Sequence, residues 1–496
     1  MTEDRSPAVS ENPEGSVEGE EEEKPKGRKN GVYGGISEEL EASMRSGWAD
    51  TELHGLEPDV QAPYAAARRA RLSAAFPGER LVVPAGNLRT RANDTEYAFR
   101  AASEYVHLTG NRTEDAILVG EPVEGGHDFA LYLLPRSDRE NGEFWLSGQG
   151  ELWVGRRHSL TESEQLYGLP VRDVRTAAEE LAATTVPTRL VRGYDAGLEA
   201  ALAEQLDAEK DEELKVFLSG LRLVKDEWEI GELRAACDAT VLGFTDVVRE
   251  LDRAVATSER WIEGTFWRRA RVEGNDVGYG SIAAAGPHAT TLHWVRNDGD
   301  VRPGELLLLD AGVETHTLYT ADVTRTLPIN GRFTPLQRKI YQAVYDAQEA
   351  GIAAVRPGNQ YLDFHKAAQR VLAARLLEWG LIDDSVYDLE KVLELGLQRR
   401  WTLHGTGHML GLDVHDCAHA RREDYVDAVL EPGMVLTVEP GLYFQADDLT
   451  VPEEYRGIGV RIEDDILVTA DGHENLSAGL PRQADEVETW MASLTS

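Results

Sequence analysis

Five charged or imidazole side chains in the second half of the chain limit its possible folds more than any other feature, because each adjoins an apolar segment. The run Leu306–Leu309 leads directly into Asp310, and we expect it to form a buried strand. It should pair, across a hairpin around 315–318, with the alternating segment 320–326 that contains Asp322. A buried carboxylate normally becomes neutral, pairs or binds a metal. The five candidate ligands are Asp310, Asp322, His408, Glu439 and Glu463.

Four carboxylates and one imidazole form an oxygen-rich, hard donor set that suits Mn²⁺ and also tolerates Co²⁺, Fe²⁺ or Zn²⁺. Five such ligands can hold two divalent ions, and ions about 3.5 Å apart can share a water and lower its pKa. His404 and His408 are four residues apart, but glycine follows His404 where a His-Glu-x-x-His zinc site has Glu. Arg461 and Glu463 are two apart, so a strand would direct both to one face. These patterns predict a hydrolytic centre with two metal ions, most suitably manganese.

Length, charge and cysteine content exclude several classes of protein. At 496 residues the chain exceeds what one core usually spans, so two domains and a tail are expected. A formal net charge of -37 argues against a nucleic-acid or anionic-membrane partner, since both require a basic surface. Cys237 and Cys417 are too few for a disulfide framework and fit a reducing compartment. Without a leader pattern or about 18 consecutive apolar residues, we expect a soluble, cytoplasmic protein.

Composition predicts three parts: a disordered acidic tail at 1–48, an N-terminal α/β domain at 49–220 and a catalytic domain at 221–496. The tail is dominated by Glu, Gly, Pro, Ser and Lys, so it cannot bury enough apolar surface to offset its ordering entropy. In the second part, short apolar strands alternate with helical segments, which indicates an α/β domain. Its predicted strands are Arg80–Pro84, Ala116–Val119, Phe129–Leu134 and Glu151–Val154, and its predicted helices are Pro63–Phe76 and Ala196–Leu206.

Long amphipathic helices are predicted in the catalytic part, with β-type segments between them that hold all five candidate ligands. The helices are predicted at Lys225–Ala254, Pro335–Val355 and Tyr361–Trp379. Trp228 and Cys237 recur at helical spacing in the first of these, so we interpret both as core residues. Cys237 has no basic neighbour in the sequence that would activate its thiol.

The chain resembles the pita-bread metallopeptidases, and within them the Xaa-Pro aminopeptidases (aminopeptidase P), from about residue 60 to about residue 490. The matching phrases are Leu-Leu-Asp310-Ala-Gly, Ala-Asp322-Val-Thr-Arg-Thr, His404-Gly-Thr-Gly-His408-Met-Leu-Gly-Leu-Asp-Val-His415-Asp, Thr-Val-Glu439-Pro-Gly-Leu-Tyr443, Gly-Val-Arg461-Ile-Glu463-Asp-Asp and Thr90-Arg-Ala-Asn-Asp94-Thr-Glu-Tyr. The resemblance implies an α/β (α+β) fold: a small N-terminal creatinase-like domain, then a C-terminal pita-bread domain. In that catalytic domain, helices surround a curved, mostly antiparallel sheet with the metals at its concave face.

The resemblance also assigns a role to each candidate ligand. It implies that Asp322 and Glu463 bridge the two metal ions and that Asp310 completes the coordination of one. His408 and Glu439 would complete the other, and Glu439 would also accept the proton of the bridging water.

On the substrate side, His293, His404 and His415 match family histidines that hydrogen-bond the scissile peptide and the developing oxyanion. Without the resemblance, a lone His293 or His415 is more often a core histidine. Arg461 would hold Asp310 in place beside the substrate. Asp94 matches a residue that in relatives reaches a neighbouring subunit's active site, although an Asp in a polar loop is usually a turn residue.

The implied reaction is removal of the first residue from a peptide whose second residue is proline, across a tertiary amide that lacks an N–H. Prolidase, an Xaa-Pro dipeptidase, would use the same metal site on dipeptides only. A pita-bread binding module or a creatinase-type amidinohydrolase would share the layout but should lack this ligand set. Relatives assemble through the N-terminal domain, so we expect a homodimer or homotetramer with peptides as substrates.

Overall fold

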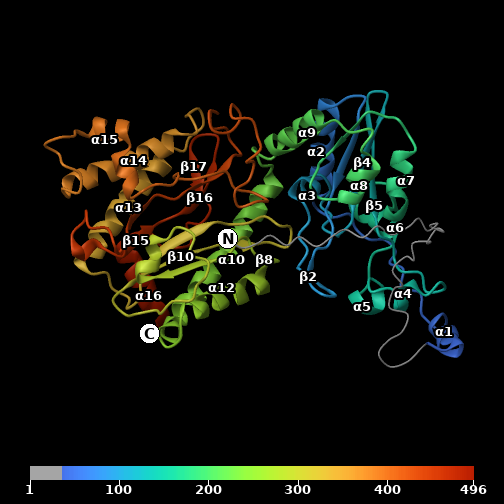
Figure 1. Cartoon of the computed structure of the whole chain (residues 1–496), viewed down its shortest axis with the longest axis horizontal. Coiled ribbons are helices and arrows are strands. Elements are labelled where there is room, and N and C mark those ends of the chain that lie inside the picture. The colour runs from blue at the N-terminus through green and yellow to red at the C-terminus, as the bar shows by residue number, and fades with distance from the viewer. Residues whose placement is uncertain (1–35, 496) are drawn as a thin grey trace, which may run out of the picture. The chain divides into compact units, whose positions relative to one another are not determined.

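The computed structural model describes residues 36–495, and Figure 1 shows their helices and strands. They fall into two compact units: residues up to 53 together with 135–159, and residues 54–134 together with 160 onward. Most of the expected tail, residues 1–35, lies outside the described part. Residues 38–44 correct the expectation of disorder, because they form helix α1 (Glu38–Met44). The Ser37 side chain accepts the backbone N–H of Leu40 and so caps that helix.

The smaller unit also contains the short helices α4 (Glu143–Leu146) and α5 (Glu151–Val154). Helix α5 shows that the predicted strand at Glu151–Val154 was wrong. A four-residue apolar run fits a strand or a helix equally well by pattern. The backbone N–H groups of Trp153 and Val154 both donate to the Gly150 carbonyl, which closes a helical turn.

In the larger unit, the N-terminal part forms a mixed five-stranded sheet in the order β6-β5-β4-β1-β7. Its central strands β1, β4 and β5 pair antiparallel, whereas β6 and β7 pair parallel at the two edges. The strands are β1 (Arg80–Pro84), β4 (Ile117–Val123), β5 (Gly126–Leu133), β6 (Val171–Asp173) and β7 (Thr188–Leu190), with a separate hairpin of β2 (Thr90–Ala92) and β3 (Thr95–Glu96). The helical elements are α2 (Ala62–Ala75), α3 (Ser103–Thr109), α6 (Leu160–Tyr167), η1 (Val174–Thr176), α7 (Ala177–Ala182), α8 (Ala196–Ala201) and α9 (Ala208–Leu221). The three other predicted strands and both predicted helices are confirmed within a few residues, while the predicted domain limits stay predictions.

The catalytic part is built on short antiparallel strands. β10 (Leu306–Ala311) lies between β9 (Ile282–Ala285) and β12 (Val323–Pro328), and all residues of the three strands are buried. The predicted pairing of the apolar run with the Asp322 segment is therefore confirmed. The remaining strands are β8 (Asp276–Val277), β11 (Val313–Glu314), β13 (Val435–Val438), β14 (Gly441–Phe444), β15 (Ile458–Arg461), β16 (Asp464–Val468) and β17 (His473–Asn475).

Helices cover these strands on two sides, with α13 and α14 on one side and α10, α12 and α16 on the other (Figure 1). Their bounds are α10 (Glu227–Arg249), α11 (Leu251–Val255), α12 (Glu259–Glu273), α13 (Pro335–Ala354), α14 (Asp363–Glu378), α15 (Leu389–Leu395) and α16 (Ala484–Thr495), with 3₁₀ turns η2 (Gly286–Thr290), η3 (Leu397–Arg400) and η4 (Glu453–Tyr455). Capping boxes headed by Asp226 and Thr334 explain where α10 and α13 begin. The three predicted helices are confirmed, and Cys237 is buried in the core as predicted.

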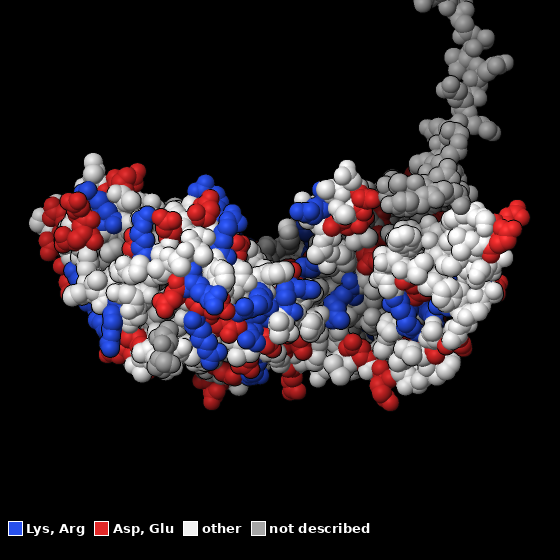
Figure 2. All heavy atoms as spheres, turned by 90° about the horizontal axis from the view of Figure 1, so that it is seen from below, with Lys and Arg blue, Asp and Glu red and all other residues white. Residues whose placement is uncertain are grey.

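Acidic and basic side chains are interspersed on the face drawn in Figure 2. Ion pairs among the described residues include those of Arg375 with Asp346 and Glu378. No helix among residues 36–495 combines the length and the apolar character needed to cross a bilayer.

Candidate metal centre and substrate cavity

All five predicted ligands line one cavity of about 660 Å³ in the catalytic part. Each comes from the end of a strand or from an irregular segment beside one. Asp310 is the fifth residue of β10 and Asp322 immediately precedes β12, whereas Glu439 directly follows β13. Strands of two sheets therefore bring together acids that are far apart in the sequence.

Glu463 lies between β15, which ends at Arg461, and β16, which begins at Asp464. The predicted continuous strand is thus interrupted here. Arg461 and Glu463 nevertheless both line the cavity, and Ile462 between them is fully buried in the core. Arg461 and Glu463 therefore face the same side, as predicted, although β15 pairs with β14 and β16 pairs with β13.

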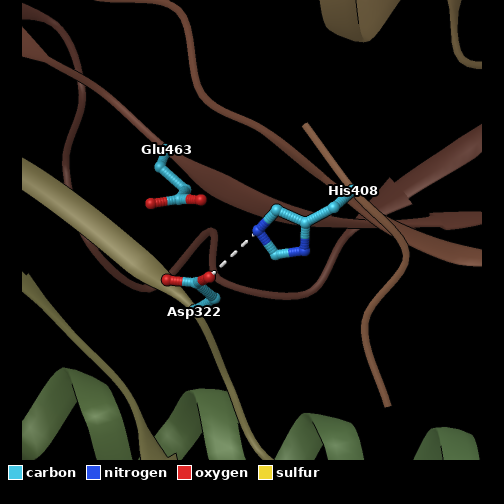
Figure 3. A group of neighbouring side chains, drawn as sticks. All are labelled: Asp322, His408 and Glu463. Atoms are coloured by element: carbon cyan, nitrogen blue, oxygen red, sulfur yellow. Dashed lines mark ion pairs between the residues drawn. The ribbon is translucent and has the colours of Figure 1, made fainter. Parts of the chain in front are cut away.

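Three of the five side chains converge closely enough to bind one metal ion. Asp322, His408 and Glu463 each offer a donor atom, and these atoms lie within 4.8 Å of one another (Figure 3). The Nε2 atom of His408 is 3.3 Å from Asp322 Oδ2 and 3.9 Å from Glu439 Oε1. Oxygen and imidazole donors in this arrangement fit a divalent transition metal.

The carboxylates of this cluster repel one another. Burial raises the pKa of Glu463 well above its usual range, and the negative charges of Asp322 and Glu439 raise it further. Burial also raises the pKa of Glu439 to about 7, against the opposing effect of His408. Carboxylates this close together hold protons unless a cation stabilises their charged forms. A divalent metal ion would supply that charge, so these residues fit a metal site.

Asp322 and His408 form an ion pair within the cluster. Burial would raise the pKa of Asp322, but the hydrogen bond and charge of His408 outweigh it and lower that pKa. Burial lowers the pKa of His408, yet Asp322 and Glu439 reverse this and raise it to about 9. The Asp322 backbone N–H donates to Asp465 Oδ2 at 3.1 Å, and the Cys237 thiol donates to the same oxygen at 3.2 Å.

Asp310 is held by two residues on the cavity wall. Arg461 donates to Asp310 Oδ2, and its other N–H groups donate to Thr324 Oγ1 at 3.1 Å and Tyr443 at 3.0 Å. The Tyr279 hydroxyl lies 2.7 Å from Asp310 Oδ1 and 2.5 Å from Asp322 Oδ1. Tyr279 therefore connects two predicted ligands.

The sequence analysis missed Tyr279 as a site residue and quoted Tyr443 only within a matching phrase. Tyr279 lies in a loop between two glycines, and Tyr443 lies on β14. A single tyrosine in a loop or a strand belongs to no regularly spaced pattern that would identify it as a site residue. Only the folded chain brings the Tyr279 hydroxyl to the acids and the Tyr443 hydroxyl to His404 and Arg461.

The three predicted substrate-side histidines also line the cavity. His293 is exposed on its rim, whereas the His415 ring packs edge-on against His408 with centroids 4.2 Å apart. His404 Nε2 is 2.9 Å from the Tyr443 hydroxyl, and His404 Nδ1 is 3.6 Å from Glu439 Oε2. Burial and the charge of Arg461 lower the pKa of His404 to about 3, so this imidazole is neutral.

Asp94 is the predicted site residue that lies outside the cavity. It occupies the exposed turn between β2 and β3, directly after Asn93, whose φ is 52°. Its predicted role concerns a neighbouring subunit and stays a prediction.

Known proteins match this chain over both of its main parts. Residues 65–189 match the aminopeptidase P N-terminal domain, and residues 231–470 match metallopeptidase family M24. The chain is 74% identical over 488 residues to Xaa-Pro aminopeptidase 1 of Streptomyces coelicolor, covering 98% of each. A zinc-substituted Escherichia coli aminopeptidase P in complex with product has a TM-score of 0.79 at 29% identity, covering 88% of this chain and 100% of that one. A substrate complex of an Escherichia coli aminopeptidase P variant has a TM-score of 0.78 at 29% identity, covering 88% and 99%.

Proposed function

Because this chain belongs to metallopeptidase family M24 and is an Xaa-Pro aminopeptidase, we propose that its five cavity ligands hold two divalent metal ions, most suitably Mn²⁺. In this proposal Asp322 and Glu463 would be shared by both ions, and Asp310 would help to hold one of them. His408 and Glu439 would help to hold the other. The supporting observation is the convergence of Asp322, His408 and Glu463 donor atoms within 4.8 Å.

Divalent ions in such a site supply Lewis acidity, which lowers the pKa of water and polarises a peptide carbonyl. The protein's own part is to move the proton. Glu439 lines the cavity with its Oε1 atom 3.9 Å from His408 Nε2, so its carboxylate is placed to accept a proton from water at the centre. We assign it the role of general base.

His404 and His415 are proposed to donate hydrogen bonds to the carbonyl oxygen as it gains negative charge. The tautomer of His404 follows from its neighbours. Arg461 can only donate, so the Tyr443 oxygen accepts from it and the Tyr443 hydrogen points to His404 Nε2. His404 Nδ1 then carries the hydrogen, 3.6 Å from Glu439 Oε2.

His293 is proposed to hydrogen-bond the scissile peptide from the rim, while Arg461 keeps Asp310 oriented toward the substrate's N-terminal end. Apolar side chains provide the surface for the proline ring, which carries no amide hydrogen. These are Ile282, Leu292, Val295 and Val414, all on the cavity wall.

We further propose that the chain acts in the cytoplasm as a homodimer or homotetramer. In such an assembly Asp94 would contribute to the cavity of a neighbouring copy. Its exposed position at the β2–β3 turn leaves it accessible for that contact.

Removal and return of the metal test the core of this proposal. Dialysis against a chelator should abolish hydrolysis of the tripeptide Arg-Pro-Pro, and added Mn²⁺ should restore it. Glu439→Gln should reduce kcat by roughly 10³-fold, because it removes both a ligand and the base. Glu431→Gln, at an exposed site eight residues earlier in the same segment, is the matched control and should leave kcat unchanged.

Activity that persists after chelation and in Glu439→Gln would contradict the assigned centre. The dipeptide Arg-Pro separates the aminopeptidase from a dipeptidase, which would cleave only the shorter substrate. We expect the tripeptide to be the better substrate.

A further inference from the structure

The segment from His404 to His408 carries two residues of the proposed centre without regular helix or strand structure. Backbone in such a segment must be fixed by other contacts. On one side, strand β13 supplies them: the Thr437 N–H donates to the His408 carbonyl at 2.9 Å, and the His408 N–H donates to Thr437 Oγ1 at 3.2 Å.

Gly407 makes this contact close. A Cβ atom at Gly407 would lie 2.0 Å from the Thr437 carbonyl oxygen and 3.0 Å from Phe364. The segment is therefore pressed between β13 and the first turn of α14, which contains Phe364. The middle residue, Thr406, is itself buried.

His365, the next residue of α14, makes the contact on the other side. Its Nδ1 atom accepts the Thr406 backbone N–H at 3.2 Å and lies 2.8 Å from Thr406 Oγ1. The Thr406 carbonyl in turn accepts the Glu439 backbone N–H at 2.8 Å. One imidazole thus connects helix α14 to the peptide that lies against Glu439 and two residues before His408.

The direction of this hydrogen bond fixes the state of His365. A backbone N–H can only donate, so Nδ1 must present its lone pair, and the imidazole is neutral with its hydrogen on Nε2. Burial and the charges of Arg399 and Lys366 lower the pKa of His365, which agrees with a neutral ring. No role in the proposed reaction has been assigned to this histidine, and it does not line the cavity.

We propose that His365 is a positioning residue that fixes the His404–His408 segment, and through it His408 and Glu439, by accepting the Thr406 backbone N–H. This inference rests on the proposed ligand roles of His408 and Glu439. Side chains that orient metal ligands from behind usually change metal affinity or activity by about 10–100-fold when they are lost.

Two polar variants of similar character separate the hydrogen bond from the bulk of the side chain. The oxygen of Asn reaches the place of Nδ1, whereas the oxygen of Gln reaches that of Nε2. His365→Asn should keep Mn²⁺ affinity and kcat within about threefold of wild type, and His365→Gln should weaken both by about 10-fold. Titration of metal-free full-length chain with Mn²⁺ alone gives the affinity, and Arg-Pro-Pro hydrolysis gives kcat and KM.

His473→Ala is the matched control, because His473 is also half-buried and its Nδ1 lies 3.1 Å from a backbone atom, the Val355 carbonyl oxygen. It should change neither readout. Equal Mn²⁺ affinities for the Asn and Gln variants, whether both are normal or both are weakened, would overturn the positioning role.

His408→Ala distinguishes this failure from failure of the proposed centre. If it weakens Mn²⁺ binding while His365→Gln does not, the ligand assignment survives and the positioning role is wrong. If it leaves Mn²⁺ binding unchanged, the ligand assignment itself is wrong.

Discussion

Glu463 and Asp464 are neighbours in the sequence and are both almost fully buried, but they lie in opposite electrostatic regions. On the cavity side, Glu463 receives a protein hydrogen bond from Thr324 at 2.7 Å and is surrounded by other acids. On the core side, Asp464 accepts from Arg325 at 2.7 Å and Gln348 at 2.8 Å, and Ser477 also donates to it.

The difference shows that burial of an acid does not by itself indicate a functional site. Asp464 has enough donors and a cation within the protein, so its charge is satisfied by the fold. Glu463 has too few hydrogen-bond donors and no paired cation among residues 36–495, and its pKa is raised because its charged form is poorly stabilised. A bound cation would remove that deficit, and the following experiments test the contrast from the largest expected effect to the smallest.

Glu463→Gln should have the largest effect and should act on function. Loss of a proposed bridging ligand should lower kcat/KM for Arg-Pro-Pro by roughly 10³-fold, or about 4 kcal/mol. The metal-free variant should unfold at the same urea concentration as wild type, because Gln replaces a carboxyl group that burial and the neighbouring acids already keep protonated. If kcat/KM stayed within tenfold of wild type, Glu463 would be a structural acid like Asp464 and not a metal ligand.

Asp464→Asn should act on stability instead. Its loss leaves Arg325 and Arg482 without a carboxylate that faces both, and we expect the free energy of unfolding to fall by about 3 kcal/mol. Urea unfolding measures this, and activity per folded molecule should stay within a few-fold of wild type. A variant that is as stable as wild type but inactive would reverse the contrast.

The stability of the metal-free chain should depend on pH because of the ionisable groups in the cavity. Folding raises the pKa of Glu439 from 4.5 to about 7 and that of His408 from 6.5 to about 9. These two groups therefore bind more protons in the folded chain than in the unfolded chain, which makes stability fall as pH rises from about 4.5 to about 9. His404, whose pKa is lowered on folding from 6.5 to about 3, opposes this fall below about pH 6.5. At 1.36 kcal/mol per pKa unit, the two increases in pKa of about 2.5 each would lower stability by about 7 kcal/mol if they were independent, and coupling between the groups and the opposing effect of His404 reduce the expected fall to a few kcal/mol.

Urea unfolding at several pH values measures the fall, and Mn²⁺ should abolish it. Glu439→Gln is the control, because it should remove the acidic part of the change. Stability that rises with pH over this window would mean that the cavity acids are already compensated within the protein.

Ser477→Ala should have the smallest effect. It removes one donor from Asp464 and leaves Arg325 and Gln348 in place, so we expect a loss of about 1 kcal/mol without change in kcat/KM. Thermal or urea unfolding beside a standard peptide assay is sufficient. A loss larger than that of Asp464→Asn would mean that Ser477 matters through its bond to the Asp465 backbone instead.

Sequence patterns predicted the cavity side better than the core side. The apolar run before Asp310 and the two-residue alternation of Arg461 and Glu463 marked where strands deliver charged groups, and the structure places these residues on the cavity wall. Nothing in the sequence distinguished Asp464 as a core acid, because its partners Arg325 and Gln348 are more than a hundred residues away. Tyr279 was missed because its partners Asp310 and Asp322 are also distant in the sequence, and a single tyrosine forms no repeating pattern.

Local ambiguity explains the remaining errors. Glu151–Val154 is too short for pattern to separate strand from helix, and the turn closed on Gly150 decides it. The helix at Glu38–Met44 was hidden within a polar segment whose composition, averaged over 48 residues, predicted disorder. In both cases a single capping or turn contact outweighed the composition of the segment.

The change from β15 to β16 across Ile462 and Glu463 makes the length of this segment as important as its chemistry. An inserted or deleted residue would send Glu463 into the core and Asp464 into the cavity, since side chains alternate along a strand. Each acid would then face the other's surroundings, with a longer carboxylate opposite Arg325 and a shorter one at the proposed metal centre. Protein engineers who diversify this region should therefore exchange side chains at fixed length and avoid indels.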